Sequence, residues 1–301
     1  MPVRLGVSPI GWSNDDLPEL GGDTPLETCL AEARRAGFEG IELGNKFPRD
    51  ASALRPILSP YGLALISGWY GAHLLQRSLS EETAAIEAHL SLLVEMGCRV
   101  MVFAETSGST AGDARRPLSQ RPRLGEKDWN DFGRRLNNLA GHLAARGIAM
   151  AYHHHMGTVV ESEGEIDRLM AATGEDVGLL LDTGHLVFAG ADPVAVARRH
   201  RHRINHVHCK DVRGEVLSRV RAADASFLDT VVDGVFTVPG DGLVDFAGVL
   251  AVLRGADYHG WLVVEAEQDP AKAPPFEYAR MGFAHLSAAA VRAGLFEGKE
   301  Q

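Results

Sequence analysis

Four short apolar runs in the second half of the chain end in side chains that can bind a metal ion or transfer a proton. The runs and the residues after them are 148–152 with His153, His154 and His155, 177–181 with Asp182 and His185, 204–207 with His208 and Lys210, and 261–264 with Glu265 and Glu267. Such runs are typical of buried parallel strands. Because parallel strands end at one edge, we expect these imidazole and carboxylate groups to meet there and hold one divalent metal ion.

Asp182 carries a specific signal, because its carboxylate lies at the edge of a dry core and needs a partner. Capping of a helix or turn is its alternative role. His206 and His208 face the same side of a strand, which favours a ligand and an imidazole that orients it. In the run His153–His155 the first and third imidazoles share a side, and hydrogen-bonded loop histidines are the alternative.

The elements that position these groups follow from the alternation of periodic segments. Strands are expected at 3–9, 39–43, 63–68, 99–104, 148–152, 177–181, 204–208 and 260–265. Helices are expected between them at 24–36, 50–60, 80–96, 126–145, 161–173, 192–199, 242–254 and 272–293. Eight strand–helix units predict an α/β fold of the (β/α)8 TIM barrel type. A doubly wound open sheet is the alternative, but no GxGxxG follows the first strand.

We expect the whole chain, 1–301, to form a single barrel domain, since no linker or low-complexity tract divides it. Two connections, 105–125 and 211–241, are longer than usual and leave the C-terminal face, where they would lie over the site. Polar and aromatic residues expected at the same face are candidates for substrate binding, and these are Trp12, Asn14, Lys46, Trp69, Glu105 and Lys210.

The composition excludes several classes of partner. The formal net charge is −10 and no long Lys/Arg run exists, so neither nucleic acid nor an acidic lipid surface is expected to bind. No run approaches the length of a membrane span. The three cysteines form no CxxC pair, and the N-terminus has no signal-peptide pattern, so a reducing cytoplasm is the expected compartment. The sequence leaves open whether the chain forms a homo-oligomer.

Several stretches resemble the xylose isomerase-like barrel superfamily of sugar isomerases and epimerases, and within it the inosose dehydratase family of myo-inositol catabolism. The stretches are 9–22, 44–50, 152–160, 181–185 and 261–270, spread over nearly the whole chain. The resemblance implies a metal-dependent dehydratase that converts scyllo-inosose (2-keto-myo-inositol), a cyclic polyol ketone, to a trihydroxycyclohexane-1,2-dione and water.

The resemblance also implies a ligand set, namely Asp182, His208 and Glu265. The superfamily's glutamate from the fifth strand aligns with His153. Either His153 takes its place or Glu161 reaches in from the following turn, and we favour His153. We expect Mn²⁺ or Co²⁺ as the metal, and the resemblance implies glutathione as a further cofactor.

For the dehydration we expect Glu265 or Glu267 to remove the α-proton, and His155 or His185 to protonate the departing hydroxyl. Three other functions compete with this one. A sugar or keto-inositol isomerase or epimerase on the same barrel would leave the substrate mass unchanged. A metal-cluster endonuclease is disfavoured by the negative charge. A non-catalytic sugar-binding protein is the third alternative. It is disfavoured because burial of several charged metal-type ligands costs free energy that sugar binding alone does not require.

Overall fold

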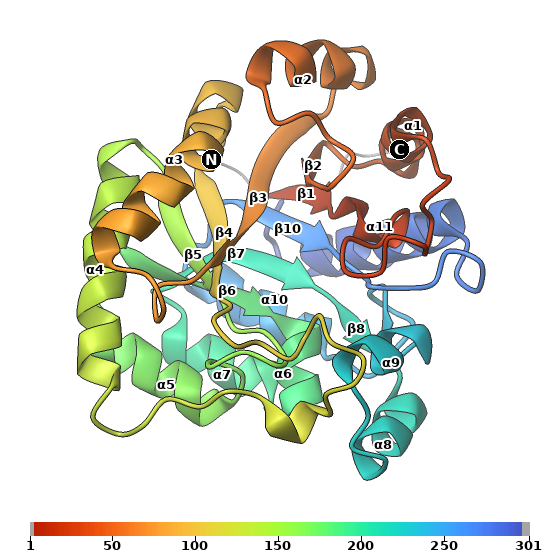
Figure 1. Cartoon of the computed structure of the whole chain (residues 1–301). Coiled ribbons are helices and arrows are strands. Elements are labelled where there is room, and N and C mark those ends of the chain that lie inside the picture. Colours follow the sequence, from red (N-terminus) through yellow and green to blue (C-terminus); the bar gives the residue numbers. More distant parts are fainter. Residues whose placement is uncertain (1–2, 297–301) are drawn as a thin grey trace.

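A computed structural model describes residues 3–296, so residues 1–2 and 297–301 of the expected domain lie outside the described part. Eight parallel strands close into a barrel in the order β1-β10-β7-β6-β5-β4-β3-β2, with helices around it (Figure 1). The (β/α)8 prediction is confirmed, and the alternative of an open doubly wound sheet is wrong.

All eight expected strands form the barrel. They are β1 (Arg4–Val7), β2 (Gly40–Leu43), β3 (Ala64–Ala72), β4 (Val100–Glu105), β5 (Ala149–His153), β6 (Val177–Asp182), β7 (Ile204–Cys209) and β10 (Trp261–Val264). β3 continues beyond the expected end at residue 68, because residues 69–72 pair in register with residues 102–105 of β4. This longer strand places Trp69 at the mouth of the barrel.

The outer layer consists of one helix after each barrel strand, as expected. These helices are α1 (Leu26–Ala36), α2 (Ala51–Leu58), α3 (Leu79–Met96), α4 (Trp129–Ala145), α5 (Glu163–Ala172), α7 (Pro193–His200), α10 (Phe246–Gly255) and α11 (Pro275–Arg292). A capping box of Ser78 and Glu81 fixes the start of α3, where the side chains satisfy backbone amides reciprocally. Among residues 3–296, no helix is long and apolar enough to span a lipid bilayer.

Side chains on the strands alternate between the helix layer and the barrel interior. Val102, Ala151 and Leu180 form a small apolar cluster of their own, separate from the large core under the helices. Residue 182 lies two positions after Leu180, and residue 153 two positions after Ala151. The same two-residue period therefore turns Asp182 and His153 inward, at the carboxyl end of the barrel.

The structure corrects the interpretation of 211–241 as one long connection. It contains β8 (Asp211–Val212), α8 (Gly214–Ala222), α9 (Phe227–Val232) and β9 (Phe236–Thr237), and β8 pairs with β9 in an antiparallel sheet. Its apolar residues pack into a second small core. The short helix α6 (Thr183–Ala189), directly after β6, was also not expected. The apolar side chains of these short segments are spaced too irregularly to predict each element.

The connection after β4 contains only a short 3-10 helix, η3 (Leu118–Gln120). It meets the segment after β7 through Ser119, whose Oγ donates to Asp224 Oδ2 at 2.6 Å and whose backbone amide donates to Asp224 Oδ1 at 3.1 Å. The two long connections are therefore tied to each other.

Candidate active site

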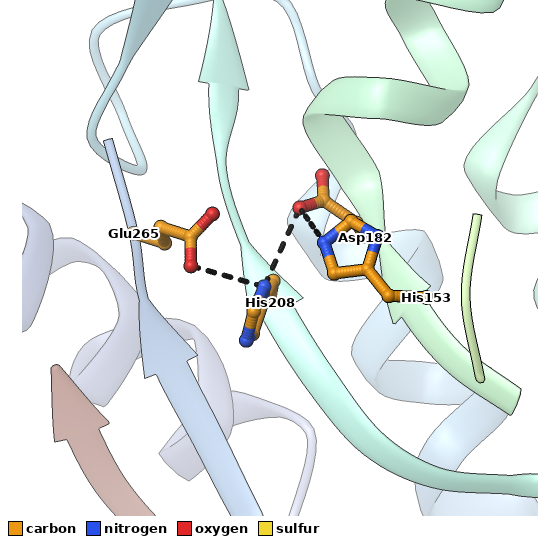
Figure 2. A group of neighbouring side chains, drawn as sticks. All are labelled: His153, Asp182, His208 and Glu265. Atoms are coloured by element: carbon orange, nitrogen blue, oxygen red, sulfur yellow. Dashed lines mark ion pairs between the residues drawn. The ribbon is translucent and has the colours of Figure 1, made fainter. Parts of the chain in front are cut away.

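Four buried side chains from the carboxyl ends of neighbouring strands point toward one another (Figure 2). His153 ends β5, Asp182 ends β6, His208 lies near the end of β7, and Glu265 follows β10. One ligand atom of each lies within 4.8 Å of the others. Asp182 Oδ2 is 3.4 Å from His153 Nε2 and 3.5 Å from His208 Nδ1, and His208 Nδ1 is 3.1 Å from Glu265 Oε2. These are the four residues that the sequence predicted as metal ligands.

Hydrogen bonds on the far side of each imidazole fix which nitrogen faces this cluster. His153 Nδ1 lies 2.8 Å from the carbonyl oxygen of His154, so Nδ1 carries the proton and Nε2 presents a lone pair. His208 Nε2 lies 3.2 Å from Glu42 Oε1, so Nδ1 is the nitrogen that faces the cluster. His153 Nε2 and His208 Nδ1 therefore both face carboxylates of the cluster.

Two atoms of the cluster are buried without a hydrogen-bond partner among residues 3–296, namely Asp182 Oδ2 and His208 Nδ1. Buried polar atoms in folded proteins nearly always have a partner. A divalent cation between them would be bound by both, because a carboxylate oxygen and an imidazole nitrogen are each metal ligands. The donor set of two imidazoles and two carboxylates thus fits a divalent metal ion.

The Asp182-Thr183-Gly184-His185 motif has a local explanation for each residue. Asp182 Oδ1 accepts from the backbone amide of His185 at 2.8 Å and caps α6, which leaves Oδ2 for the cluster. Thr183 Oγ1 bonds to the backbone of Lys210. A Cβ at Gly184 would lie 2.5 Å from Lys210 Cγ, so glycine is needed for the lysine stem to pass. The capping role of Asp182 is therefore present alongside the free oxygen.

Glu161, the alternative fourth ligand, lies elsewhere. Its Oε1 is 3.2 Å from Arg121 Nε, and its Oε2 accepts from the backbone amide of Gly157 at 2.7 Å. Both oxygens are thereby held away from the cluster. The fourth member of the cluster is His153, not Glu161.

Lys210 lies beneath the cluster with its ammonium fully buried. Nζ is 2.7 Å from Glu265 Oε1, 2.9 Å from Glu267 Oε2 and 3.6 Å from Asp182 Oδ2. It also lies 4.7 Å from the centre of the Phe236 ring. Burial alone would lower the pKa of Lys210, but the three carboxylates raise it above its ordinary value, so the side chain stays charged.

His155 and Glu267 form a pair beside the cluster of His153, Asp182, His208 and Glu265, which we call the metal-type cluster. His155 Nδ1 is bonded to the carbonyl of Met156, so Nε2 points toward Glu267 Oε1, 3.9 Å away. Burial opposes a charge on either group. The Glu267 carboxylate nevertheless raises the pKa of His155, and Lys210 lowers the pKa of Glu267. Both groups therefore favour their charged forms.

His185 lies behind His155, with ring centres 4.1 Å apart. Its Nδ1 accepts from the backbone amide of Met156, and its Nε2 is 3.1 Å from Lys210 Nζ. Burial and the charge of Lys210 hold the pKa of His185 well below its ordinary value. His185 is therefore a neutral imidazole with both nitrogens engaged.

A cavity of about 360 Å³ opens onto these groups. Six of the expected site residues line it: Trp69, His153, His155, His208, Glu265 and Glu267. The indole of Trp69 is 42% exposed and lies edge-on to the two histidines, with ring centres 5.4 Å from His153 and 5.5 Å from His155. Asp182, His185 and Lys210 lie in the layer behind the wall, where they contact residues that line it.

The structure does not bring Trp12 or Lys46 to this cavity. The Trp12 indole is buried, and its Nε1 donates to Glu32 Oε2 at 2.7 Å. The ammonium of Lys46 donates to three backbone carbonyls within residues 21–24. Both side chains fix the path of the loop after β1. In the sequence, a side chain with this supporting role cannot be distinguished from one that contacts a substrate.

Asn14 and Glu105 also have structural partners. The amide oxygen of Asn14 accepts from the backbone amides of residues 16–17, both at 2.9 Å, and so shapes the turn that carries the cavity's acidic residues. The carboxylate of Glu105 accepts from the backbone amides of Leu74 and Ser107 at 2.7 and 2.8 Å. Neither side chain lines the cavity.

Several lining residues are not among the candidate site residues that the sequence predicted. Asp15, Asp16 and Asn45 come from the loops after β1 and β2, and Glu42 comes from β2 itself. Burial raises the pKa of Asp15 to about 6. Glu42 carried a sequence signal, because it is an acidic residue inside an apolar strand. The loop residues carried none, because no periodicity indicates which loop side chains turn inward.

Comparison with known proteins agrees with this geometry. A family model described as a xylose isomerase-like TIM barrel matches residues 30–289. The chain is 53% identical over 294 residues to the rhizopine catabolism protein MocC of Rhizobium meliloti, covering 98% of this chain and 90% of that protein. It is 50% identical over 279 residues to the inosose dehydratase of Geobacillus thermodenitrificans, covering 92% of this chain and 94% of that protein.

Among solved structures, the IOLI protein with a binding zinc atom superposes with a TM-score of 0.64 at 14% identity, covering 98% of this chain and all of that one. At this identity the likeness concerns the fold alone.

Proposed function

The chain belongs to the family of xylose isomerase-like TIM barrels, and from this premise we propose that it is an inosose dehydratase. The reaction is the removal of water from scyllo-inosose to give a trihydroxycyclohexane-1,2-dione. The observation that carries the proposal is that a metal-type cluster and a separate carboxylate–imidazole pair line one cavity, in a chain half identical to a named inosose dehydratase.

The metal would be held by His153, Asp182, His208 and Glu265, with Mn²⁺ or Co²⁺ as the expected ion. When bound, such an ion acts as a Lewis acid on the ketone oxygen and makes the neighbouring C–H bond more acidic. The cavity also has a flat aromatic wall, Trp69, against which a six-membered ring can lie.

Glu267 is the base in this proposal. Its Oε2 is held by Lys210, whereas Oε1 faces His155 at a distance too long for a hydrogen bond and is free for a substrate proton. Glu265 is less suited to this role, because its oxygens lie 2.7 Å from Lys210 Nζ and 3.1 Å from His208 Nδ1.

His155 is the acid. Glu267 takes the α-proton, the electrons of the C–H bond form the new C=C bond, and the β-hydroxyl leaves with a proton from His155 Nε2 as water. The enol that results is a tautomer of the 1,2-dione and converts to it by a proton shift from oxygen to carbon. His185 is less suited to act as the acid, because it lies behind His155, where it packs against and supports the His155 ring. One carboxylate and one imidazole suit an elimination, whereas an epimerase needs two bases on opposite faces of a carbon.

The test is mass spectrometry of the purified protein with scyllo-inosose and Mn²⁺ or Co²⁺, with EDTA as the control. Loss of one water that EDTA abolishes supports the proposal, whereas a new isomer of equal mass refutes it in favour of an epimerase. Rhizopine is included as a second substrate, because of the name of the 53% identical relative. Parallel assays with and without glutathione determine whether that cofactor is required.

The fourth ligand is tested by a matched pair of variants. His153→Gln should lower metal affinity strongly, whereas Glu161→Gln should leave it unchanged, because Glu161 is bonded to Arg121 and Gly157. Equal metal affinity of wild type and His153→Gln would refute the assignment of His153.

A further inference from the structure

Glu42 gathers three hydrogen-bond donors beneath the metal-type cluster. Its Oε1 lies 2.5 Å from Ser67 Oγ, 2.9 Å from His206 Nε2 and 3.2 Å from His208 Nε2. All four side chains are buried. A single carboxylate oxygen therefore accepts from a hydroxyl and two imidazoles.

This contact crosses the interior of the barrel. Glu42 lies on β2, whereas His206 and His208 lie on β7, and β1 and β10 separate these two strands along the closed sheet. His206 and His208 are two residues apart on one strand and so face inward together. The carboxylate reaches both, and this fixes the two imidazole rings relative to the opposite wall.

A metal ion between Glu42, His206 and His208 is the competing interpretation, since their ligand atoms are also close together. Atoms bound tetrahedrally to one metal at about 2.1 Å are separated by about 3.4 Å. The observed 2.9 Å between His206 Nε2 and Glu42 Oε1 is shorter than this and matches a direct hydrogen bond. Hydrogen bonding therefore accounts for the group without an ion.

We propose that Glu42 is a positioning residue that holds the His208 imidazole as its Nε2–H tautomer, with the Nδ1 lone pair directed at the metal cluster. This rests on the metal-binding part of the proposed function. Carboxylates that bond to the outer nitrogen of a ligand histidine set its orientation and basicity, and their removal typically lowers metal affinity about 10–100-fold.

The experiment is a Co²⁺ titration of metal-free wild type, Glu42→Ala, Glu42→Gln and a control, Glu105→Gln. Glu105 is a buried strand-end carboxylate that, among residues 3–296, bonds to backbone amides and to no imidazole, so it controls for the loss of a buried charge. Visible absorption of bound Co²⁺ reports ligand geometry, and circular dichroism reports folding. We expect Glu42→Ala to bind Co²⁺ about 10–100-fold more weakly with an altered spectrum, Glu42→Gln to be intermediate, and Glu105→Gln to match wild type.

Unchanged Co²⁺ affinity and an unchanged spectrum in folded Glu42→Ala would overturn the proposal. It would also be overturned if wild type bound two Co²⁺ ions and Glu42→Ala bound one, because Glu42 would then be a metal ligand. If Glu42→Ala does not fold, Glu42→Gln decides, because it keeps the side-chain volume and one acceptor; wild-type affinity in that variant would overturn the proposal. Absence of Co²⁺ binding in wild type would instead refute the metal part of the proposed function.

Discussion

Replacement of Lys210 by methionine is expected to destabilise the metal-free protein more than any exposed charge substitution. The ammonium is fully buried and lies within 3.6 Å of Asp182, Glu265 and Glu267. Methionine keeps an unbranched stem that can still pass Gly184, so the change removes the charge with little loss of packing. Three buried carboxylates then lack their cation, and removal of one partner of a buried ion pair typically costs about 3–5 kcal/mol.

The assay is urea unfolding followed by circular dichroism at pH 7, in EDTA and in saturating Mn²⁺. Because the pKa of Lys210 is raised in the folded state, its contribution to stability is fully present below the unfolded pKa of about 10.4 and is lost only at higher pH. The pKa of Glu267 is lowered, so its contribution is present above about pH 4.3 and is lost as the pH falls. The difference between wild type and variant should therefore shrink toward pH 4, and also in Mn²⁺, whose charge substitutes for the ammonium.

Lys272→Met is the matched control. The side chain of Lys272 is 62% exposed and is 3.6 Å from one carboxylate, Asp269, so its removal should change the free energy of unfolding by less than about 1 kcal/mol. If Lys210→Met in EDTA unfolds within about 0.5 kcal/mol of wild type, the reasoning about an uncompensated buried charge is wrong.

Three further substitutions test other parts of the site. The pKa of Asp15 is raised to about 6, so the folded state retains a proton that the unfolded state loses between about pH 4 and 6. Wild type therefore loses stability over this range, and the free energy of unfolding of Asp15→Asn in urea should rise by about 1–2 kcal/mol relative to that of wild type between pH 4 and pH 7. Asp182→Asn keeps an amide oxygen to accept from His185 but loses the ligand oxygen, so it should fold and yet bind Mn²⁺ poorly in a metal titration, and tight binding would contradict the ligand role. Gly184→Ala brings a Cβ within 2.5 Å of Lys210 Cγ and should lower the free energy of unfolding by about 1–3 kcal/mol, and wild-type stability would contradict the need for glycine at this position.

The strand-end residues could be predicted because the information is local. An apolar run that stops at a carboxylate or imidazole marks both the strand and its carboxyl end, and the two-residue period then fixes the inward side chains. Asp182, His208 and Glu265 were found in this way together with the family resemblance, and the structure places them within one cluster.

The residues that were misjudged depend on contacts distant in sequence. Trp12 and Lys46 follow the first and second strands, as cavity residues also do, but their partners Glu32 and the carbonyls of residues 21–24 turn them into loop supports. Glu42 was not among the predicted site residues. Its contact with His206 spans 164 residues of sequence, and no local pattern predicts a pairing across the barrel.

The charges of the site provide the physical reason why this barrel end needs a cation. Four carboxylates are buried at this end of the barrel, those of Glu42, Asp182, Glu265 and Glu267, and the ammonium of Lys210 lies beside the last three. These five side chains carry a net charge of −3 before any imidazole is protonated. Uncompensated buried charge is costly. A divalent ion reduces the imbalance to −1, and a proton on His155, opposite Glu267, removes it. The electrically neutral state of the loaded site is then the one in which the proposed base is ionised and the proposed acid is protonated, which is the state that an elimination requires.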